Sequence, residues 1–162
     1  IIHDWKKALS GENEWVERAK KIVSKCFIAT KWLHDETELK ELLKSKGANI
    51  PQSITYHDPC HARKTQGVWR EPRALLSQNA KLIEMENPNR CCGFGGVTIQ
   101  TERFELAQMA GEPKAQMIKE TGAAIVSAEC SACRMQLTNA MYQNGVDVTF
   151  KNPLEIIAEA LS

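Results

Sequence analysis

Ala123-Ala124-Ile125-Val126-Ser127 leads through Ala128-Glu129 into Cys130-Ser131-Ala132-Cys133, and this passage decides the fold. The run 123–127 is β-prone and predicts a strand, whereas 131–143 has a helical pattern. Both thiols would lie in the first turn of that helix, where unpaired N–H groups and the helix dipole favour the thiolate, the form that binds metal. The passage therefore predicts a strand–helix unit that carries a pair of reactive thiols.

From residue 51 onward the chain alternates in the same way between β-prone runs and helical patterns. The further strands expected are 53–56, 82–85 and 146–150, and the further helices are 72–78, 101–110, 114–121 and 153–161. Gly111-Glu112-Pro113 should break the middle helix, because proline suits the first turn of a helix and disrupts its interior. This alternation predicts an α/β fold with a mostly parallel sheet of about four strands flanked by helices.

The first fifty residues predict a helical lead-in packed on the same domain, 51–162. Apolar residues recur at a helical period over 14–24, and a second helix is expected over 35–46, with Asp35 as its N-cap. Core or interdomain packing is expected for the four tryptophans, and apolar packing for one isolated cysteine: Trp5, Trp15, Trp32, Trp69 and Cys26. Because the chain opens without Met, we expect a piece of a longer polypeptide.

Composition is ordinary for a soluble globular protein, with 43% hydrophobic and 25% charged residues. The net charge of +1 gives no reason to expect nucleic acid or an anionic membrane surface as a partner. No apolar run approaches the ~20 residues that a membrane-spanning helix needs, and the opening residues, in which Lys6 and Lys7 follow Trp5, lead us to expect no secretory signal. Six cysteines in this setting predict reduced thiols in the cytoplasm, where clustered thiols indicate metal or redox chemistry.

Three of the four expected strands run into loops that carry cysteine. Cys60 follows the first strand, Cys91 and Cys92 follow the second, and Cys130 follows the third. In a parallel α/β sheet the C-terminal ends of the strands share one edge, where ligands usually bind. Cysteines that are far apart in the sequence are therefore expected to converge on one site.

The adjacent pair Cys91–Cys92 is followed at once by glycines at Gly93, Gly95 and Gly96. In a regular strand the two thiols would point to opposite faces. Glycines permit unusual backbone angles and the close approach of a bulky ligand, so such a loop can turn both sulfurs toward one multinuclear centre. Two unrelated core thiols or a vicinal disulfide are the alternatives.

Two histidines, His57 and His61, flank Cys60 in the segment Tyr56-His57-Asp58-Pro59-Cys60-His61. Their spacing of four would suit zinc on a helix, but Pro59 disfavours a helix there. They are weak ligand candidates, and hydrogen bonds to a sulfide or to a cysteine sulfur suit them at least as well. Simple exposure at the surface is the alternative.

The count of thiols is itself informative. Structural zinc takes four ligands, and an ordinary [4Fe–4S] cube also takes four cysteines. Five thiols therefore indicate either one spare ligand or a centre that is not an ordinary cube. A thioredoxin-like redox pair at Cys130 and Cys133 is a further reading, but it leaves the thiols of the other two loops without a role.

The order Cys60, Cys91-Cys92-Gly93, Cys130-x-x-Cys133 resembles the cysteine-rich CCG domain. The resemblance covers 54–161 and includes four segments: 57–61, the turn 92–96, Thr121-Gly122-Ala123 and Asn152-Pro153-Leu154-Glu155. Such domains, commonly in tandem pairs, occur in one of the subunits of heterodisulfide reductase. They also occur in iron–sulfur subunits of glycolate oxidase, lactate-utilisation proteins, anaerobic glycerol-3-phosphate dehydrogenase and an unusual class of succinate or fumarate reductases.

The resemblance implies an iron–sulfur domain that transfers electrons or reduces a substrate in a multi-subunit oxidoreductase. A noncubane [4Fe–4S] cluster would be held by all five thiols of the motif: Cys60, Cys91, Cys92, Cys130 and Cys133. Zinc in a structural module that mediates subunit contacts is the alternative. Implied partners are flavin-bearing or ferredoxin-like subunits, in a complex that is quinone-linked or anchored at the inner face of a membrane. With one copy of the motif and no ferredoxin-type cysteine runs, the chain resembles a C-terminal CCG domain that is not expected to catalyse alone.

Overall fold

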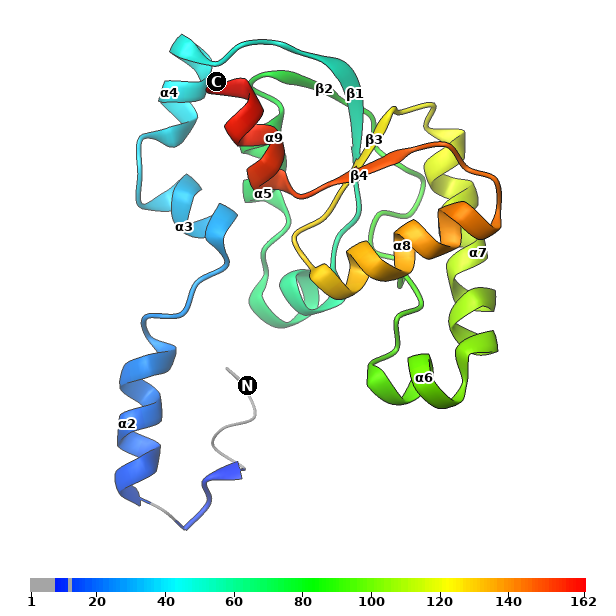
Figure 1. Cartoon of the computed structure of the whole chain (residues 1–162). Coiled ribbons are helices and arrows are strands. Elements are labelled where there is room, and N and C mark those ends of the chain that lie inside the picture. The colour runs from blue at the N-terminus through cyan, green and yellow to red at the C-terminus, as the bar shows by residue number, and fades with distance from the viewer. Residues whose placement is uncertain (1–7, 12) are drawn as a thin grey trace.

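The computed structural model describes residues 8–11 and 13–162 and has a parallel sheet with helices on both faces (Figure 1). The strands are β1 (Ile50–Tyr56), β2 (Ala80–Leu82), β3 (Ile125–Ser127) and β4 (Thr149–Lys151). Their order in the sheet is β2-β1-β3-β4, and every neighbouring pair is parallel. The predicted α/β fold with a four-stranded parallel sheet is confirmed.

Helices precede the first strand and connect the others. They are α2 (Asn13–Val23), α3 (Ala29–Asp35), α4 (Leu39–Lys46), α5 (Arg70–Leu76), α6 (Val97–Glu102), α7 (Phe104–Glu120), α8 (Ser131–Gln143) and α9 (Pro153–Ala160), with a π-helical turn, η1, at His61–Thr65. Asn152 begins α9 through a capping box: its side chain accepts the N–H of Leu154, and the Glu155 carboxylate accepts the N–H of Asn152.

Alternation along β3 divides the core into two layers. Ile125 belongs to a cluster that contains Ile54 of β1 and the apolar faces of α5 and α9. Its neighbour Val126 belongs to the opposite cluster, which contains Leu137 of α8 and Ile118 of α7. Successive side chains of a strand point to opposite faces, so β3, whose three residues are all buried, is covered on both sides, as parallel sheets require.

The predicted break at 111–113 is wrong, because α7 runs without interruption through Pro113. Gly111 is buried where α7 meets α8, and a Cβ there would lie only 2.8 Å from Nε2 of Gln136. Proline removes the N–H that would bind the carbonyl of Met109, whose side chain is 68% exposed, so water can reach this part of the helix. Close packing against α8 therefore outweighs one missing hydrogen bond, and the break lies instead at Arg103.

The lead-in also differs from expectation. The helix predicted over 35–46 begins later, as α4 at Leu39, and a helix that was not predicted, α3, precedes it and ends at Asp35. Helix α3 packs against α5, whereas α2 has no buried residues and stands apart from the sheet (Figure 1).

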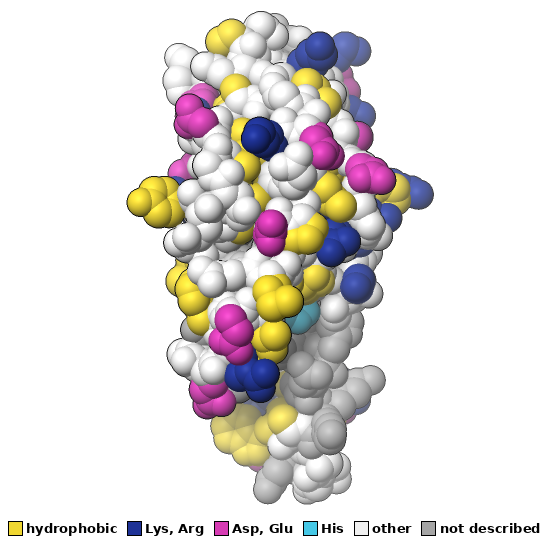
Figure 2. All heavy atoms as spheres, turned by 90° about the vertical axis from the view of Figure 1, so that its right-hand side faces the viewer, with side chains coloured by type: hydrophobic (Ala, Val, Ile, Leu, Met, Phe, Trp, Pro, Cys, Tyr) yellow, Lys and Arg dark blue, Asp and Glu magenta, His cyan; other side chains and the backbone are white. Residues whose placement is uncertain are grey.

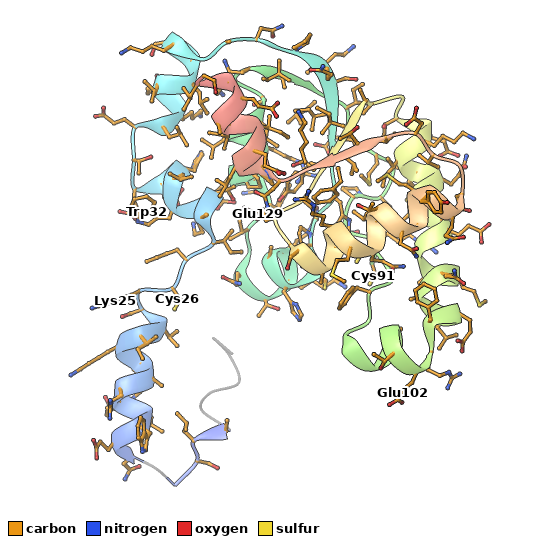
Figure 3. The ribbon with its side chains drawn as sticks, in the orientation of Figure 1. Lys25, Cys26, Trp32, Cys91, Glu102 and Glu129 are labelled. Carbon is orange, nitrogen blue, oxygen red and sulfur yellow. The ribbon has the colours of Figure 1, made fainter. Side chains whose placement is uncertain are left out.

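Several lead-in side chains lie at the surface for the same reason, and the apolar packing expected for Cys26 is wrong. Cys26 is exposed on the link that follows α2 (Figure 3). Trp15 and Trp32 are 51% and 44% exposed, so neither is a core residue. Trp69 is half-buried, with the guanidinium groups of Arg63 and Arg70 over its ring, and Trp5 lies outside the described residues.

On the side that lies to the right in Figure 1, the surface is neither uniformly charged nor uniformly apolar. Acidic, basic and apolar side chains are interspersed over that face (Figure 2). Among the described residues, each helix is either too short or too polar to cross a lipid bilayer.

Truncation of a residue at the centre of the sheet tests this core. Ile54→Ala removes a side chain that is 0% exposed, and we expect a loss of about 2–5 kcal/mol in the free energy of unfolding, measured by urea denaturation. Ile22→Ala, on the exposed face of α2, should change that energy by less than about 0.5 kcal/mol. Equal losses in the two variants would contradict the assigned core.

Candidate metal centre

The C-terminal ends of β1 and β3 set the floor of the candidate site. The pairing of these strands continues one residue beyond β1, because the N–H of His57 donates to the carbonyl of Ser127 over 2.9 Å. The next residue, Asp58, donates its N–H to the carbonyl of Pro88 over 2.9 Å. These two bonds join the loop after β1 to the strand before Cys130 and to the segment that leads into Cys91.

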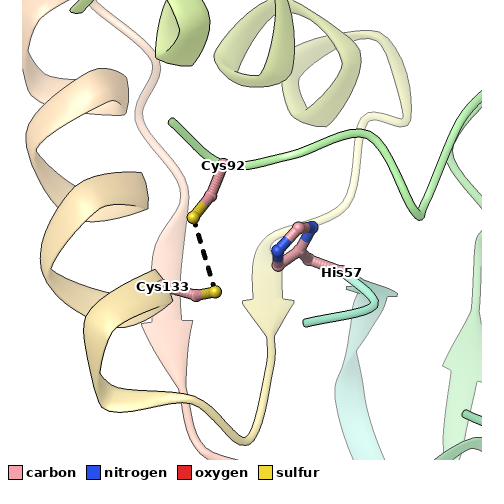
Figure 4. Close-up of side chains that lie close together, drawn as sticks. All are labelled: His57, Cys92 and Cys133. Carbon is pink, nitrogen blue, oxygen red and sulfur yellow. Dashed lines mark hydrogen bonds between the residues drawn. The ribbon is translucent and has the colours of Figure 1, made fainter. Parts of the chain in front are cut away.

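Three side chains form a compact, fully buried group at this edge (Figure 4). The Sγ atoms of Cys92 and Cys133 lie 3.4 Å apart and share a hydrogen bond. A ring nitrogen of His57 and both sulfurs lie within 4.8 Å of one another. Thiolate sulfur and imidazole nitrogen at such separations are a donor set that suits zinc or iron.

The CxxC pair begins α8 as the sequence predicted. Cys130 is the N-cap residue, with an extended backbone, and Cys133 lies in the first turn. A hydrogen bond with Cys133 and the N–H groups of Cys133 and Ala132 hold the pKa of Cys130 at about 5. The Cys92 thiol has a lowered pKa because it shares a hydrogen bond with Cys133 and His57 lies beside it, while the pKa of Cys133 itself is raised by Cys130 and Cys92. The geometry thus favours thiolates at two of these three positions.

Cys60 and Cys91 lie nearer the surface than the buried pair of Cys92 and Cys133. The pKa of Cys60 is raised by burial and then by the neighbouring thiols of Cys91, Cys92 and Cys130, which places Cys60 within electrostatic reach of all three. Cys91 is exposed (Figure 3), and its sulfur accepts the N–H of Gly93 over 3.4 Å. The structure therefore brings the thiols of the three loops to one sheet edge, with two of them packed tightly and Cys91 at the surface.

The two candidate histidines have different environments. His57 is 1% exposed, and neither ring nitrogen has a hydrogen-bond partner among the residues that the structure describes. His61 is exposed, at the start of η1. Pro59 separates them as predicted, since the chain is extended at His57 and helical only after the proline.

The glycines act through their backbone. Gly93, Gly95 and Gly96 all have positive φ, at 94°, 65° and 84°, a region that favours glycine. At Gly93 a Cβ would also lie 2.7 Å from the carbonyl oxygen of Ala107. Glycine at this position therefore lets the turn after Cys92 pack directly on α7, which aims the Cys92 thiol inward.

A buried carboxylate that the sequence did not reveal organises the loop around Cys60. The Asp58 side chain is 0% exposed and pairs with both Arg63 and Arg73. Arg73 also donates to both carboxylate oxygens of Glu84 and lies over the ring of Tyr56. Only pairing makes a buried charge tolerable, so this network fixes the loop between β1 and η1 in one conformation.

Lys114 is a second buried charged residue near the site that the sequence did not reveal. It is 0% exposed, and its Nζ donates to the carbonyls of Asn87 over 2.8 Å and Pro88 over 3.2 Å. It thereby ties α7 to the segment that precedes Cys91. Burial lowers its pKa to about 8, while nearby Asp58 and Cys92 favour its charge. A lysine on the otherwise apolar stripe of α7 was the available signal.

A cavity of about 310 Å³ adjoins the site on the side of α3. Cys130 and Glu129 line it together with Thr30, Pro59 and Ala62, among others. The Thr30 hydroxyl donates to Glu129, which lies at the turn between β3 and α8 (Figure 3). Burial raises the pKa of the Glu129 carboxyl. The lead-in helix thus forms one wall of the approach to Cys130.

Fold and site together define a class: a parallel α/β domain whose strand-end loops carry a cysteine group suited to metal. The sequence pattern of one such family, the cysteine-rich domain called CCG, matches residues 54–138. The chain belongs to the cysteine-rich CCG domain family, and the resemblance predicted from its residues is confirmed.

Several proteins are similar to the chain over two thirds of its length or more. An uncharacterized iron–sulfur protein of Methanococcus maripaludis is 37% identical over 67% of this chain and 24% of the relative. One subunit of the dihydromethanophenazine:CoB–CoM heterodisulfide reductase of Methanosarcina barkeri is 34% identical over 82% and 33%. Lactate utilization protein A of Halalkalibacterium halodurans is 29% identical over 97% and 63%. The chain spans less than two thirds of each of these relatives.

Removal of the buried carboxylate should be far more costly than removal of its exposed neighbour. Asp58→Ala leaves Arg73 without its buried partner, and we expect a loss of about 3–5 kcal/mol in the free energy of unfolding. Glu84→Ala removes the other partner of the same arginine, at a side chain that is 51% exposed, and should cost less than about 1 kcal/mol. Urea denaturation of the metal-free protein measures both; the reverse order would contradict the network.

Lys114 should give the stability a specific pH dependence. Its pKa is about 8 when folded, against an ordinary value of 10.5, so between these values the unfolded chain binds more protons and stability rises with pH. The advantage of the wild type over Lys114→Met in urea unfolding should therefore increase from pH 8 to pH 10.5. Lys119→Met, at an exposed site on the same helix, should show no such trend, and a flat difference for Lys114→Met would contradict the assignment.

Proposed function

We propose that the chain is the iron–sulfur domain of a multi-subunit oxidoreductase, and that it holds a noncubane [4Fe–4S] cluster. Five thiols would serve as ligands: Cys60, Cys91, Cys92, Cys130 and Cys133. The observation that carries the proposal is the meeting of three cysteine-bearing loops at one edge of the sheet, where Cys133 is hydrogen-bonded to both Cys92 and Cys130. The count of five supports an unusual cluster, because an ordinary cube takes four cysteines.

The chemistry of the donors supports the same proposal. Thiolate is the form that binds iron, and the pKa values of Cys92 and Cys130 are both lowered. The two orphaned nitrogens of His57 indicate that a further group is needed to satisfy the site. The relatives add that one bears the name iron–sulfur protein and another belongs to a heterodisulfide reductase.

A bound cluster of this kind supplies reversible electron transfer. The residues of the chain would shield the cluster from water and leave it accessible to redox partners. Met85, Val126 and Leu137 pack around the inner thiols and exclude water, which favours transfer without loss of the metal. The exposed Cys91 and the cavity beside Cys130 bring opposite parts of the site near the surface. A flavin-bearing or ferredoxin-like partner could donate electrons at one, and an acceptor could approach the other.

A structural zinc module is the second candidate, and the compact group of His57, Cys92 and Cys133 favours it. Zinc prefers four nitrogen and sulfur ligands in a tetrahedron, and Cys130 would complete that set. In this case the chain would stabilise subunit contacts without redox chemistry, and Cys60 and Cys91 would be dispensable for the metal.

Anaerobic reconstitution distinguishes the two. With ferrous iron and sulfide, the chain should take up about four iron and four acid-labile sulfide per molecule, and each of the five Cys→Ser variants should lower that content. Cys26→Ser is the matched control, since Cys26 is exposed and lies on the link after α2, and it should leave the content unchanged. One tightly held zinc without acid-labile sulfide, retained in Cys60→Ser and Cys91→Ser, would overturn the iron–sulfur proposal.

A further inference from the structure

His57 is held rigidly at the inner side of the site. Its backbone N–H donates to the carbonyl of Ser127 in β3. The backbone N–H of Asp58, the next residue, donates to the carbonyl of Pro88, ahead of the cysteine pair. Pro59 then fixes the backbone before η1 begins. Because both neighbouring peptide groups are anchored and the ring itself is buried, the imidazole has little room to turn away from Cys92 and Cys133 (Figure 4).

The charged groups around this ring are already paired elsewhere. The carboxylate of Asp58 is occupied by Arg63 and Arg73, and the ammonium of Lys114 is directed at the carbonyls of Asn87 and Pro88. The sulfurs of Cys92 and Cys133 lie within 4.8 Å of a ring nitrogen. A buried imidazole without hydrogen-bond partners is unfavourable. We therefore expect the ring to form a hydrogen bond with one of these sulfurs when the site is occupied.

We propose that His57 donates a ring N–H hydrogen bond to the sulfur of the iron–sulfur centre at Cys92, and so acts as a positioning residue that raises the reduction potential of the centre. This inference rests on the proposed function. Hydrogen bonds to cysteine or sulfide sulfur stabilise the more negatively charged, reduced state of a cluster. The interaction also explains why a polar ring sits in the core, 1% exposed, where a leucine or phenylalanine would pack at no polar cost.

Substitution gives the first test. His57→Phe keeps a ring of similar size but has no N–H, and we expect its reconstituted centre to keep its iron and sulfide while its midpoint potential becomes more negative. Loss of iron to a chelator should be about tenfold faster or more. His61→Phe, four residues on and exposed, is the matched control and should leave the potential unchanged. Equal potentials in wild type and His57→Phe would overturn the proposal.

Isotope labelling gives a second test that needs no substitution. Electron spin-echo spectra of the paramagnetic centre, in protein with ¹⁵N only in the imidazole rings of its histidines, should show a weak ¹⁵N coupling transmitted through the hydrogen bond. Absence of coupling would show a histidine that does not contact the centre, and a strong coupling would show a direct nitrogen ligand; either result overturns the proposal. Failure of the proposed function is distinguishable, because the chain would then take up no acid-labile sulfide in the first place.

Discussion

The parallel pairing of β1 with β3 is the interaction on which the rest of the structure depends. The register places Tyr56 opposite Ser127, and the bond from His57 to Ser127 extends it beyond the end of β1. Both strands therefore leave the sheet at the same level, and the thiols of Cys60 and Cys130 follow within a few residues. A slip of one residue would turn every side chain of β1 to the other face, and the cysteine loops would no longer meet.

The second strand contributes less directly, because a longer connection separates the end of β2 at Leu82 from the pair that begins at Cys91. This connection is held by polar contacts instead of strand pairing. The backbone N–H of Asp58 and the ammonium of Lys114 bind its backbone, through the carbonyls of Asn87 and Pro88. A buried charge such as that of Lys114 is an expensive way to fix a loop. Its presence indicates that the position of the cysteine pair matters more here than maximal stability.

Local pattern was enough to predict four strands, although β2 lies at Ala80–Leu82 and not at 82–85, because a strand depends on residues that are close in sequence. The parallel sheet and the grouping of the thiols then followed from the rule that parallel strands end at one edge. Helix α8 has the predicted bounds, 131–143. Prediction failed where a distant partner decides the outcome. The sequence could not show that Gly111 packs against Gln136 of α8. It also could not show that the apolar face of α2 is exposed and not buried. Asp58 passed unnoticed because its arginine partners became visible only in three dimensions.

The contact between Thr30 and Glu129 links a helix that precedes the family match to the residue beside Cys130. Leu43 of α4 and Ile156 of α9 likewise complete the core around Ile54, although both lie outside residues 54–138. The segment that carries the family pattern is thus smaller than the unit that folds cooperatively. A chain cut at the family borders would leave one face of its sheet bare to water, and the cysteine loops would lose the scaffold that aligns them.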